Sequence, residues 1–181
     1  MIAALRNRLR LFRRKEDGTV TVDFVIMVPF YIGVFLASAE LGIMSMRYAF
    51  LERSLDLAVR DIRLSTGFTP THDQLVAQIC NQAAVIPNCT ENLTLQMFER
   101  DPRNWQDVPA AATCGTLGDA NPDIDPVVRF DSGEANELMF LRACATVDAV
   151  FPGAIFRPVT TLNANGEYAL VVENVFVQEP R

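Results

Sequence analysis

The sequence predicts an α+β protein: a long N-terminal transmembrane-to-periplasmic helix, followed by a small domain with a short helix and an antiparallel sheet of about three strands. Three observations support this fold class. A long apolar run lies near the N-terminus, an amphipathic helical pattern continues from it, and strand-like segments separated by turn signals follow. The 181 residues suffice for one modest domain besides a membrane segment.

The apolar run extends from Phe24 to Met46, and its one charged residue is Glu40. A bilayer core needs roughly 20 apolar helical residues, so the run is long enough to cross it. Pro29 lies near the start of the run, where a kink is tolerated because the freed carbonyl groups can find other partners. Glu40 lies about 25 Å along the helix from Asp23, so we expect an interfacial charge that reaches toward water.

The charges on the two sides of the apolar run differ. The first 17 positions contain six basic and two acidic residues, whereas 10 arginines and 18 acidic residues follow from Arg47 onward. Short basic flanks stay in the cytoplasm, so we expect a single-pass protein with a cytoplasmic N-terminus and an exported C-terminal domain. A basic arm can also bind nucleic acid, but the acidic remainder would repel phosphate, and we expect no nucleic-acid partner.

The helical pattern continues beyond the apolar run. Apolar residues recur at alternating steps of three and four and predict one buried face: Leu41, Met44, Tyr48, Leu51, Leu55, Ala58 and Ile62. Gly67 and Pro70 predict the end of the helix. We therefore expect a leader at 1–18, one continuous helix at 19–66, about 70 Å long, and a periplasmic domain at 67–181. The membrane span would be about 24–46 and the amphipathic extension 47–66.

Local signals define the elements of the outer domain. Thr71 and Gln74 fit a capping box at the start of a helix that ends before Pro87. Alternating or branched residues predict strands at Leu93–Phe98, Leu138–Val150 and Glu167–Val177. Residues 100–133, rich in Pro, Gly, Asp and Asn, predict a loop, and 163–166 predict a turn.

All four cysteines, Cys80, Cys89, Cys114 and Cys144, lie beyond the membrane segment, as expected for two disulfides on the exported side. Four cysteines permit three pairings. We favour Cys80–Cys89 with Cys114–Cys144, because the first pair closes a short loop. A zinc site is the rival interpretation, but the chain has no Cys-x-x-Cys pair and a single histidine.

The sequence predicts no catalytic residues, no metal site, no cofactor and no small-molecule substrate, so we do not expect an enzyme. The one histidine, His72, lies in a helix-capping segment, and a glycine-rich phosphate loop is absent. Asp119, Asn121, Asp123 and Asp125 alternate loosely, as in a calcium loop, but the glycine and the closing glutamate of such a loop are missing.

A specific pattern surrounds the start of the apolar run. Gly18 is followed by Thr19, a short spacer, the acidic–aromatic pair Asp23 and Phe24, and then Pro29, six residues after the carboxylate. This pattern resembles the N-terminus of TadE-type pseudopilins (TadE/TadG-like proteins) of the tight-adherence (Flp) type IV pilus assembly system. In that family a glycine and a short spacer precede a glutamate and an aromatic residue, and a proline follows the glutamate by six residues.

Three further segments are similar to that family. Glu40-Leu41-Gly42 looks like the acid-aromatic-glycine step at the far end of the family's helix, and residues 60–63 look like its arginine-rich close. The segment 168–180 is similar to the family's final strand, which often ends in an acid–proline pair, as Glu179-Pro180 does here. The resemblance is specific over residues 13–66 and loose thereafter.

The resemblance implies a minor pilin or pseudopilin that takes part in assembly of an adhesive pilus and is anchored in the bacterial inner membrane. A dedicated prepilin peptidase would cut after Gly18 and leave Thr19 as the N-terminus. Asp23, the fifth mature residue, would pair with the terminal amine of a neighbouring subunit, because an unpaired charge in the membrane is costly. The implied partners are the inner membrane, the prepilin peptidase, other pilin-like subunits and the assembly platform.

Two other interpretations remain open. Ala37-Ser38-Ala39 fits a secretory cleavage site, and cleavage after Ala39 would release a soluble, disulfide-bonded periplasmic protein. The long basic arm and the helical pattern that continues past this site argue against it. A membrane-anchored enzyme is the third interpretation, and nothing in the outer domain favours it. The chain also departs from the family at Asp23, where glutamate, one methylene longer, is usual.

Overall fold

The computed structural model describes residues 19–64, 70–101, 103, 130–131, 133–151 and 167–179. The chain divides into two compact units, residues 1–39 and 40–181. The described part of the first unit is helical. The second unit combines helices with a three-stranded antiparallel sheet, so the predicted α+β fold class is confirmed.

Helix α2 extends from Thr19 to Leu64, and all 46 residues are helical, including Pro29. The predicted end at Thr66 lies outside the described residues. Among the residues that the structure describes, α2 is the one helix long and apolar enough to cross a membrane. Its last turn carries Arg63, a favourable place for a cation because the helix C-terminus carries partial negative charge.

The sheet has the order β1-β2-β3, with β1 at Leu93–Arg100, β2 at Leu138–Val147 and β3 at Tyr168–Val177. Both strand pairs are antiparallel, so β2 is the central strand. Leu95, Ala143 and Val172 lie opposite one another across the three strands, which puts their side chains on the same face. All three predicted strands are therefore present, although β1 extends further than expected and β2 ends earlier.

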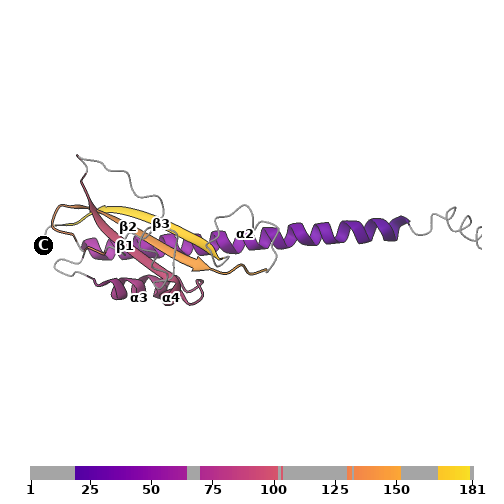
Figure 1. Cartoon of the computed structure of the whole chain (residues 1–181), viewed down its shortest axis with the longest axis horizontal. Helices are drawn as coiled ribbons and strands as arrows, with labels where there is room; N and C mark the ends of the chain where they lie inside the picture. Colours follow the sequence, from indigo (N-terminus) through magenta and orange to yellow (C-terminus); the bar gives the residue numbers. More distant parts are fainter. Residues whose placement is uncertain are drawn as a thin grey trace, which may run out of the picture. The chain divides into compact units, whose positions relative to one another are not determined.

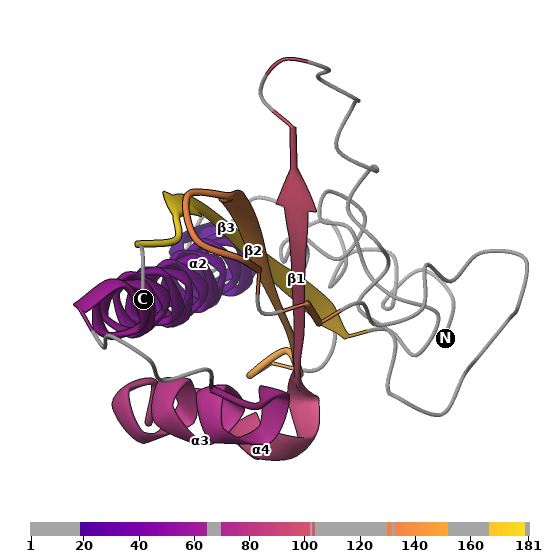
Figure 2. The same cartoon turned by 90° about the vertical axis from the view of Figure 1, so that its left-hand side faces the viewer.

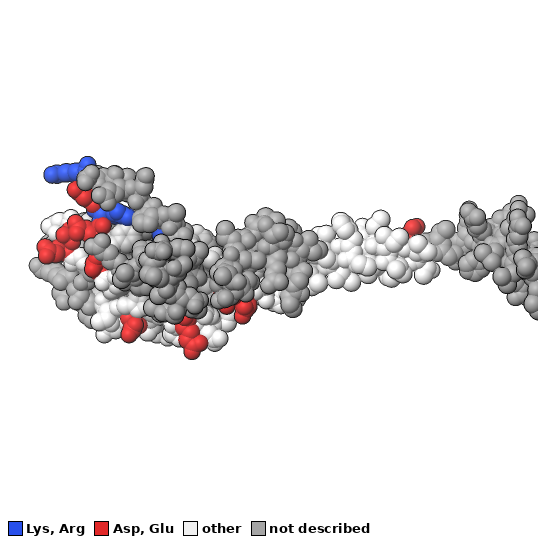
Figure 3. Space-filling view, in the orientation of Figure 1, with Lys and Arg blue, Asp and Glu red and all other residues white. Residues whose placement is uncertain are grey.

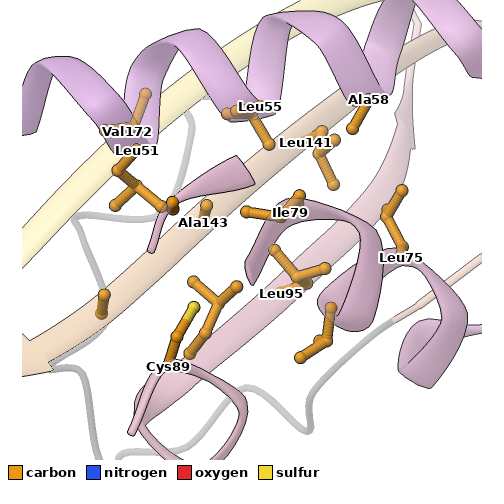
Figure 4. Packing of buried hydrophobic residues seen from close by; sticks show 14 of the residues in the cluster. Leu51, Leu55, Ala58, Leu75, Ile79, Cys89, Leu95, Leu141, Ala143 and Val172 are labelled. Atoms are coloured by element: carbon orange, nitrogen blue, oxygen red, sulfur yellow. The ribbon is translucent and has the colours of Figure 1, made fainter. Parts of the chain in front are cut away.

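The core lies between one face of the sheet and the helices (Figures 1 and 2). Figure 4 shows side chains of α2 directed toward side chains of β2 and β3, while those of α3 lie near β1. The fully buried residues at the centre are aliphatic, as close packing requires: Leu51, Leu55, Leu75, Ile79, Leu95 and Leu141. This contact explains why α2 becomes amphipathic in its second half.

The predicted buried stripe of α2 is correct over its C-terminal part and wrong at two positions. Leu51 and Leu55 are fully buried, and Ala58 and Ile62 lie with them in the core. Leu41 and Tyr48, however, are 50% and 43% exposed. The difference lies along the helix: both residues precede Leu51, the first residue of α2 in the core, although Leu41 has the same angular position as the buried Val59.

Helix α3 spans His72–Gln82, and its predicted capping box is confirmed. The hydroxyl of Thr71 accepts a hydrogen bond from the Gln74 amide, and the Gln74 side chain accepts one from the Thr71 amide at 3.1 Å. A second, four-residue helix, α4, spans Cys89–Asn92 and leads into β1. The sequence did not indicate it. Asn88, in the left-handed conformation at φ 47°, makes the turn that precedes it.

The outward face of the sheet is also covered along its central strand. Arg142 of β2 is buried and forms an ion pair with Glu173 of β3, with its Nε and Nη2 both 2.7 Å from one carboxylate oxygen. Phe98 of β1 stacks on Phe140 of β2 with ring centroids 5.1 Å apart. Large side chains on both flanking strands therefore shield β2, which explains why it is buried on both faces.

The predicted disulfide between Cys80 of α3 and Cys89 of α4 is present. Cys144 on β2 is also disulfide-bonded, while its predicted partner, Cys114, lies outside the described residues. No cysteine among the described residues is free. The Cys80–Cys89 bond joins positions nine residues apart and ties the end of α3 to the start of the segment that enters β1.

Replacing both Cys80 and Cys89 by Ala should lower the free energy of unfolding by about 2 to 3 kcal/mol, because a cross-link over a short loop reduces the entropy of the unfolded chain. Urea unfolding of the full chain in detergent, compared with the exposed-site control Asn81→Ala, measures the difference. Non-reducing peptide mapping supplies the covalent evidence. Four free thiols in protein isolated from an oxidising compartment would contradict the assignment.

Candidate membrane and assembly helix

The residues of the predicted processing and assembly motif belong to the N-terminal end of α2. Gly18 lies outside the described residues, and Thr19 is the first residue of the helix. Asp23 and Phe24 are exposed one turn further along, and Asp23 has no hydrogen bond or ion pair to another described residue.

The first part of α2 is apolar on every side. Valine, phenylalanine, isoleucine and tyrosine side chains are exposed all around the helix between Val20 and Leu36. Figure 3 shows this part as white surface except for red near its N-terminal end, and Asp23 is the acidic residue of this segment. A helix that is apolar all round needs lipid or other protein around it rather than water. The coarse prediction of an apolar helix able to span a membrane is therefore confirmed.

Pro29 lies inside α2 and is exposed, as its place in the apolar run predicted. Proline has no amide hydrogen, so the carbonyl oxygen of Val25, one turn earlier, lacks its usual intrahelical donor. In a membrane such an oxygen needs a donor from another chain or from water. The helix itself continues past this point without interruption.

A second apolar stripe on α2 was missed by the sequence analysis. Ile43, Phe50, Leu57 and Leu64 recur at every seventh position, and none of them lies in the core. Phe50 and Leu64 are exposed and the other two are half-buried, with exposed Arg53 and Arg60 between them. We refer to these four apolar residues as the heptad stripe. These side chains lie outside the core and form an apolar strip interrupted by arginines, without the second apolar position per heptad that a coiled-coil seam has.

Glu40 is not the exposed interfacial charge that the sequence predicted, because it is only 3% exposed. Its two carboxylate oxygens accept hydrogen bonds from the backbone amides of Val150 and Phe151, at 3.0 and 3.1 Å. The same contacts explain why β2 ends at Val147 rather than at Val150, since these two amides bond to Glu40 instead of to a neighbouring strand. Arg47, two turns further along α2, donates to the carbonyl oxygen of Asp148 at 3.2 Å.

The C-terminal end of α2 meets the end of β3. Arg63 and Glu179 form an ion pair at 3.7 Å, with both side chains about half-exposed. They line a shallow pocket between the last turns of α2 and the end of β3, together with Asp56 and Asn174, whose side chains are hydrogen-bonded to each other. An exposed ion pair of this kind contributes little to stability, so the pocket has the character of solvated surface.

The described residues contain no group of three or more His, Cys, Asp or Glu side chains that could hold a metal ion. His72 is hydrogen-bonded to the adjacent Asp73 at 3.0 Å and meets the ring of Phe130 edge-on. In the part of the chain that the structure describes, each cysteine is disulfide-bonded, and the hydroxyl groups of Ser38 and Ser54 donate to carbonyl oxygens of α2. Residues 119–125, the loose calcium-like pattern, lie outside the described residues.

Comparisons with known proteins found no matching family model, no matching curated protein and no matching solved structure.

Proposed function

We propose that the chain is a minor pilin or pseudopilin that takes part in assembly of a tight-adherence (Flp-type) pilus, anchored in the inner membrane by α2. One observation is the main support. A single uninterrupted helix, Thr19–Leu64, exposes apolar residues on all sides in its first part and packs on a sheet in its last part. A subunit of a membrane-assembled fibre needs both properties in one element.

The mechanism follows from the spacing between Thr19 and Asp23. Cleavage after Gly18 would create a terminal amine at Thr19, about 6 Å along the helix axis from Asp23. The carboxylate of Asp23 has no partner among the described residues of its own chain, and a buried unpaired charge is costly in lipid. The amine of a neighbouring subunit, displaced along the fibre axis, supplies a partner of opposite charge. Each added subunit would thereby receive a fixed register.

The heptad stripe supports a role in packing with neighbouring subunits. Its exposed apolar side chains continue the apolar surface of α2 beyond the membrane segment, on a side that the sheet leaves uncovered. Arg53 and Arg60 lie between them and can pair with acidic side chains of another subunit, since the exported part of the chain is strongly acidic. The stripe therefore fits a helix that is covered only after assembly.

A soluble periplasmic protein, released by cleavage after Ala39, is the second candidate function. One observation favours it: the second compact unit begins at Glu40, the residue that such a cleavage would leave at the N-terminus. That unit contains the core and the Cys80–Cys89 disulfide, so release would keep both. In this case Asp23 and the heptad stripe would have no role in assembly.

Intact-mass measurement and N-terminal sequencing of protein isolated from host cells distinguish the two functions. We expect Thr19 as the first residue in the membrane fraction. Glu40 in the soluble fraction would establish the secretory interpretation, and Met1 would show an uncut anchor and remove the processing step. Two variants form a matched pair. Gly18→Leu should prevent processing, whereas Ala39→Leu, which blocks a small-residue signal-peptidase site, should leave the Thr19 product unchanged.

A further inference from the structure

Two side chains of helix α2, Glu40 and Arg47, bind the backbone of residues 148–151 at two points along the helix. All of these residues belong to the second compact unit, residues 40–181, which is called the outer unit below. The carboxylate of Glu40 accepts from the amides of Val150 and Phe151, and the guanidinium of Arg47 donates to the carbonyl of Asp148. The two side chains are seven residues apart on α2, which corresponds to two helical turns. We refer to residues 148–151, held in this way, as the clamped segment.

The bonds to Glu40 satisfy groups that would otherwise need water. The clamped segment has no strand partner among the described residues, so its amides depend on side-chain or solvent acceptors. A carboxylate that accepts two backbone amides forms charge-assisted hydrogen bonds and is itself removed from solvent, here to 3% exposure. The hydrogen bonds therefore satisfy both the Glu40 carboxylate and the two backbone amides of Val150 and Phe151.

The clamp lies where the apolar part of α2 gives way to charged residues. Between Asp23 and Glu40 the sequence contains no charged side chain, and Arg47 is the next charge after Glu40. The rise from Glu40 to Arg47 is about 10 Å, comparable to the thickness of one headgroup layer. If α2 crosses the bilayer, Glu40 is at the edge of the hydrocarbon and Arg47 is at the level of the lipid phosphates.

The end of the clamped segment that is bonded to Glu40 presents apolar side chains, whereas the exposed Asp148 lies at the level of Arg47. Val150 is 40% exposed although it is apolar, and Phe151 beside it is half-buried. Their amides are already satisfied by Glu40, so entering a less polar layer would leave no unpaired backbone donor at these two positions. A valine and a phenylalanine with paired amides fit the interface of a lipid bilayer better than bulk water.

We propose that the clamped segment is a membrane-docking element, in which Glu40 holds Val150 and Phe151 so that they enter the bilayer interface and seat the outer unit on the membrane. The proposal rests on the membrane anchoring in the proposed function. The partner is a lipid surface. Glu40 has a positioning role, because it holds the two amides of Val150 and Phe151.

Depth-dependent fluorescence quenching tests the proposal. The native Trp105, outside the described residues, is replaced by Phe, and the full chain is reconstituted in phosphatidylglycerol–phosphatidylcholine vesicles containing acyl-brominated lipid. Leu41→Trp, beside Glu40 on α2, serves as the positive control. Val177→Trp is the matched negative control, because Val177 is a valine of similar exposure, 48%, on the end of β3.

We expect Val150→Trp to be quenched at least twofold more than Val177→Trp and to approach Leu41→Trp. Phe151→Trp, an aromatic replacement at the second residue of the proposal, gives a second reporter should Val150→Trp not fold. Quenching of both reporters at the level of Val177→Trp would overturn the proposal. A blue-shifted but unquenched emission from the Val150→Trp variant would also overturn it, because it would mean that another copy of the chain, and not lipid, covers the segment.

Glu40→Gln tests the positioning role. Glutamine is nearly isosteric but has only one oxygen, so it can accept from one of the two amides, and its own amide group faces the other donor. Quenching of Val150→Trp should fall toward the negative control in this background, while Glu52→Gln, an exposed site on α2, should leave it unchanged. Unchanged quenching with Glu40→Gln would remove Glu40 from the proposal.

Flotation of the same vesicles separates this proposal from the anchoring on which it rests. A chain that does not float with the vesicles would contradict both the membrane anchor and the docking element. A chain that floats, with a quenched Leu41→Trp and an unquenched Val150→Trp, would contradict the docking element alone.

Discussion

Asp23→Ala should abolish pilus assembly while the protein remains in the membrane. The substitution removes the carboxylate near the start of α2 and leaves the apolar surface between Val20 and Leu36 intact. Membrane insertion depends on that apolar surface and should therefore be unchanged. Assembly, in contrast, would lose the one partner of opposite charge for the terminal amine of the neighbouring subunit. We expect at least a tenfold loss of pili, counted by electron microscopy and by immunoblot of the sheared surface fraction.

Three further variants make the Asp23 test specific. Asp23→Asn keeps the size and removes the charge, and it should fail like Asp23→Ala. Asp23→Glu keeps the carboxylate and lengthens the side chain by one methylene, so it should keep assembly. Thr21→Ala, two residues earlier on the exposed helix, is the matched control and should have no effect. Normal piliation of both Asp23→Ala and Asp23→Asn would contradict the pairing role.

Leu55→Ala should lower the free energy of unfolding of the outer unit by about 2 to 5 kcal/mol, because it leaves a cavity in a closely packed core. Leu55 is fully buried and its side chain points toward those of the sheet (Figure 4). A loss of this size is a large part of the total stability of a small domain. Urea unfolding followed by circular dichroism measures it.

Leu64→Ala provides the control on the same helix. Leu64 is 65% exposed, so its truncation should change the free energy of unfolding by about 0.5 kcal/mol or less. Equal effects of the two substitutions would show that α2 does not pack on the sheet through the face described above. A selective loss of pili with Leu64→Ala, at unchanged stability, would instead add weight to the heptad stripe as a surface between subunits.

Several features could be predicted because their causes lie close together in the sequence. The capping box depends on residues three apart, Thr71 and Gln74, and it is present. The Cys80–Cys89 pair closes a short loop, and it too is present. Alternating apolar residues predicted a strand at β2, and the strand is present, with Met139, Leu141 and Ala143 in the core. Such patterns depend on local geometry, which neighbouring residues largely determine.

Other features could not be predicted because their partners are distant in the sequence. The acceptor for the Val150 amide is Glu40, 110 residues earlier, and no local pattern indicates such a contact. The exposure of Leu41 and Tyr48 depended on how far along α2 the core extends. The short helix α4 has too few residues for a periodic signal, and the left-handed Asn88 that precedes it is set by the connection between α3 and β1.

By itself, the sequence determined that this protein has a long apolar helix, an α+β outer domain and a short-range disulfide, because hydrophobic periodicity and loop length act locally. Only the tertiary structure decided which face of α2 meets the sheet and which stripe stays uncovered, since that depends on packing against strands that are distant in the sequence. It also decided the state of Glu40. From sequence alone, a carboxylate on a helix is expected to be solvated. Only the folded chain brings the amides of Val150 and Phe151 within hydrogen-bonding distance of Glu40.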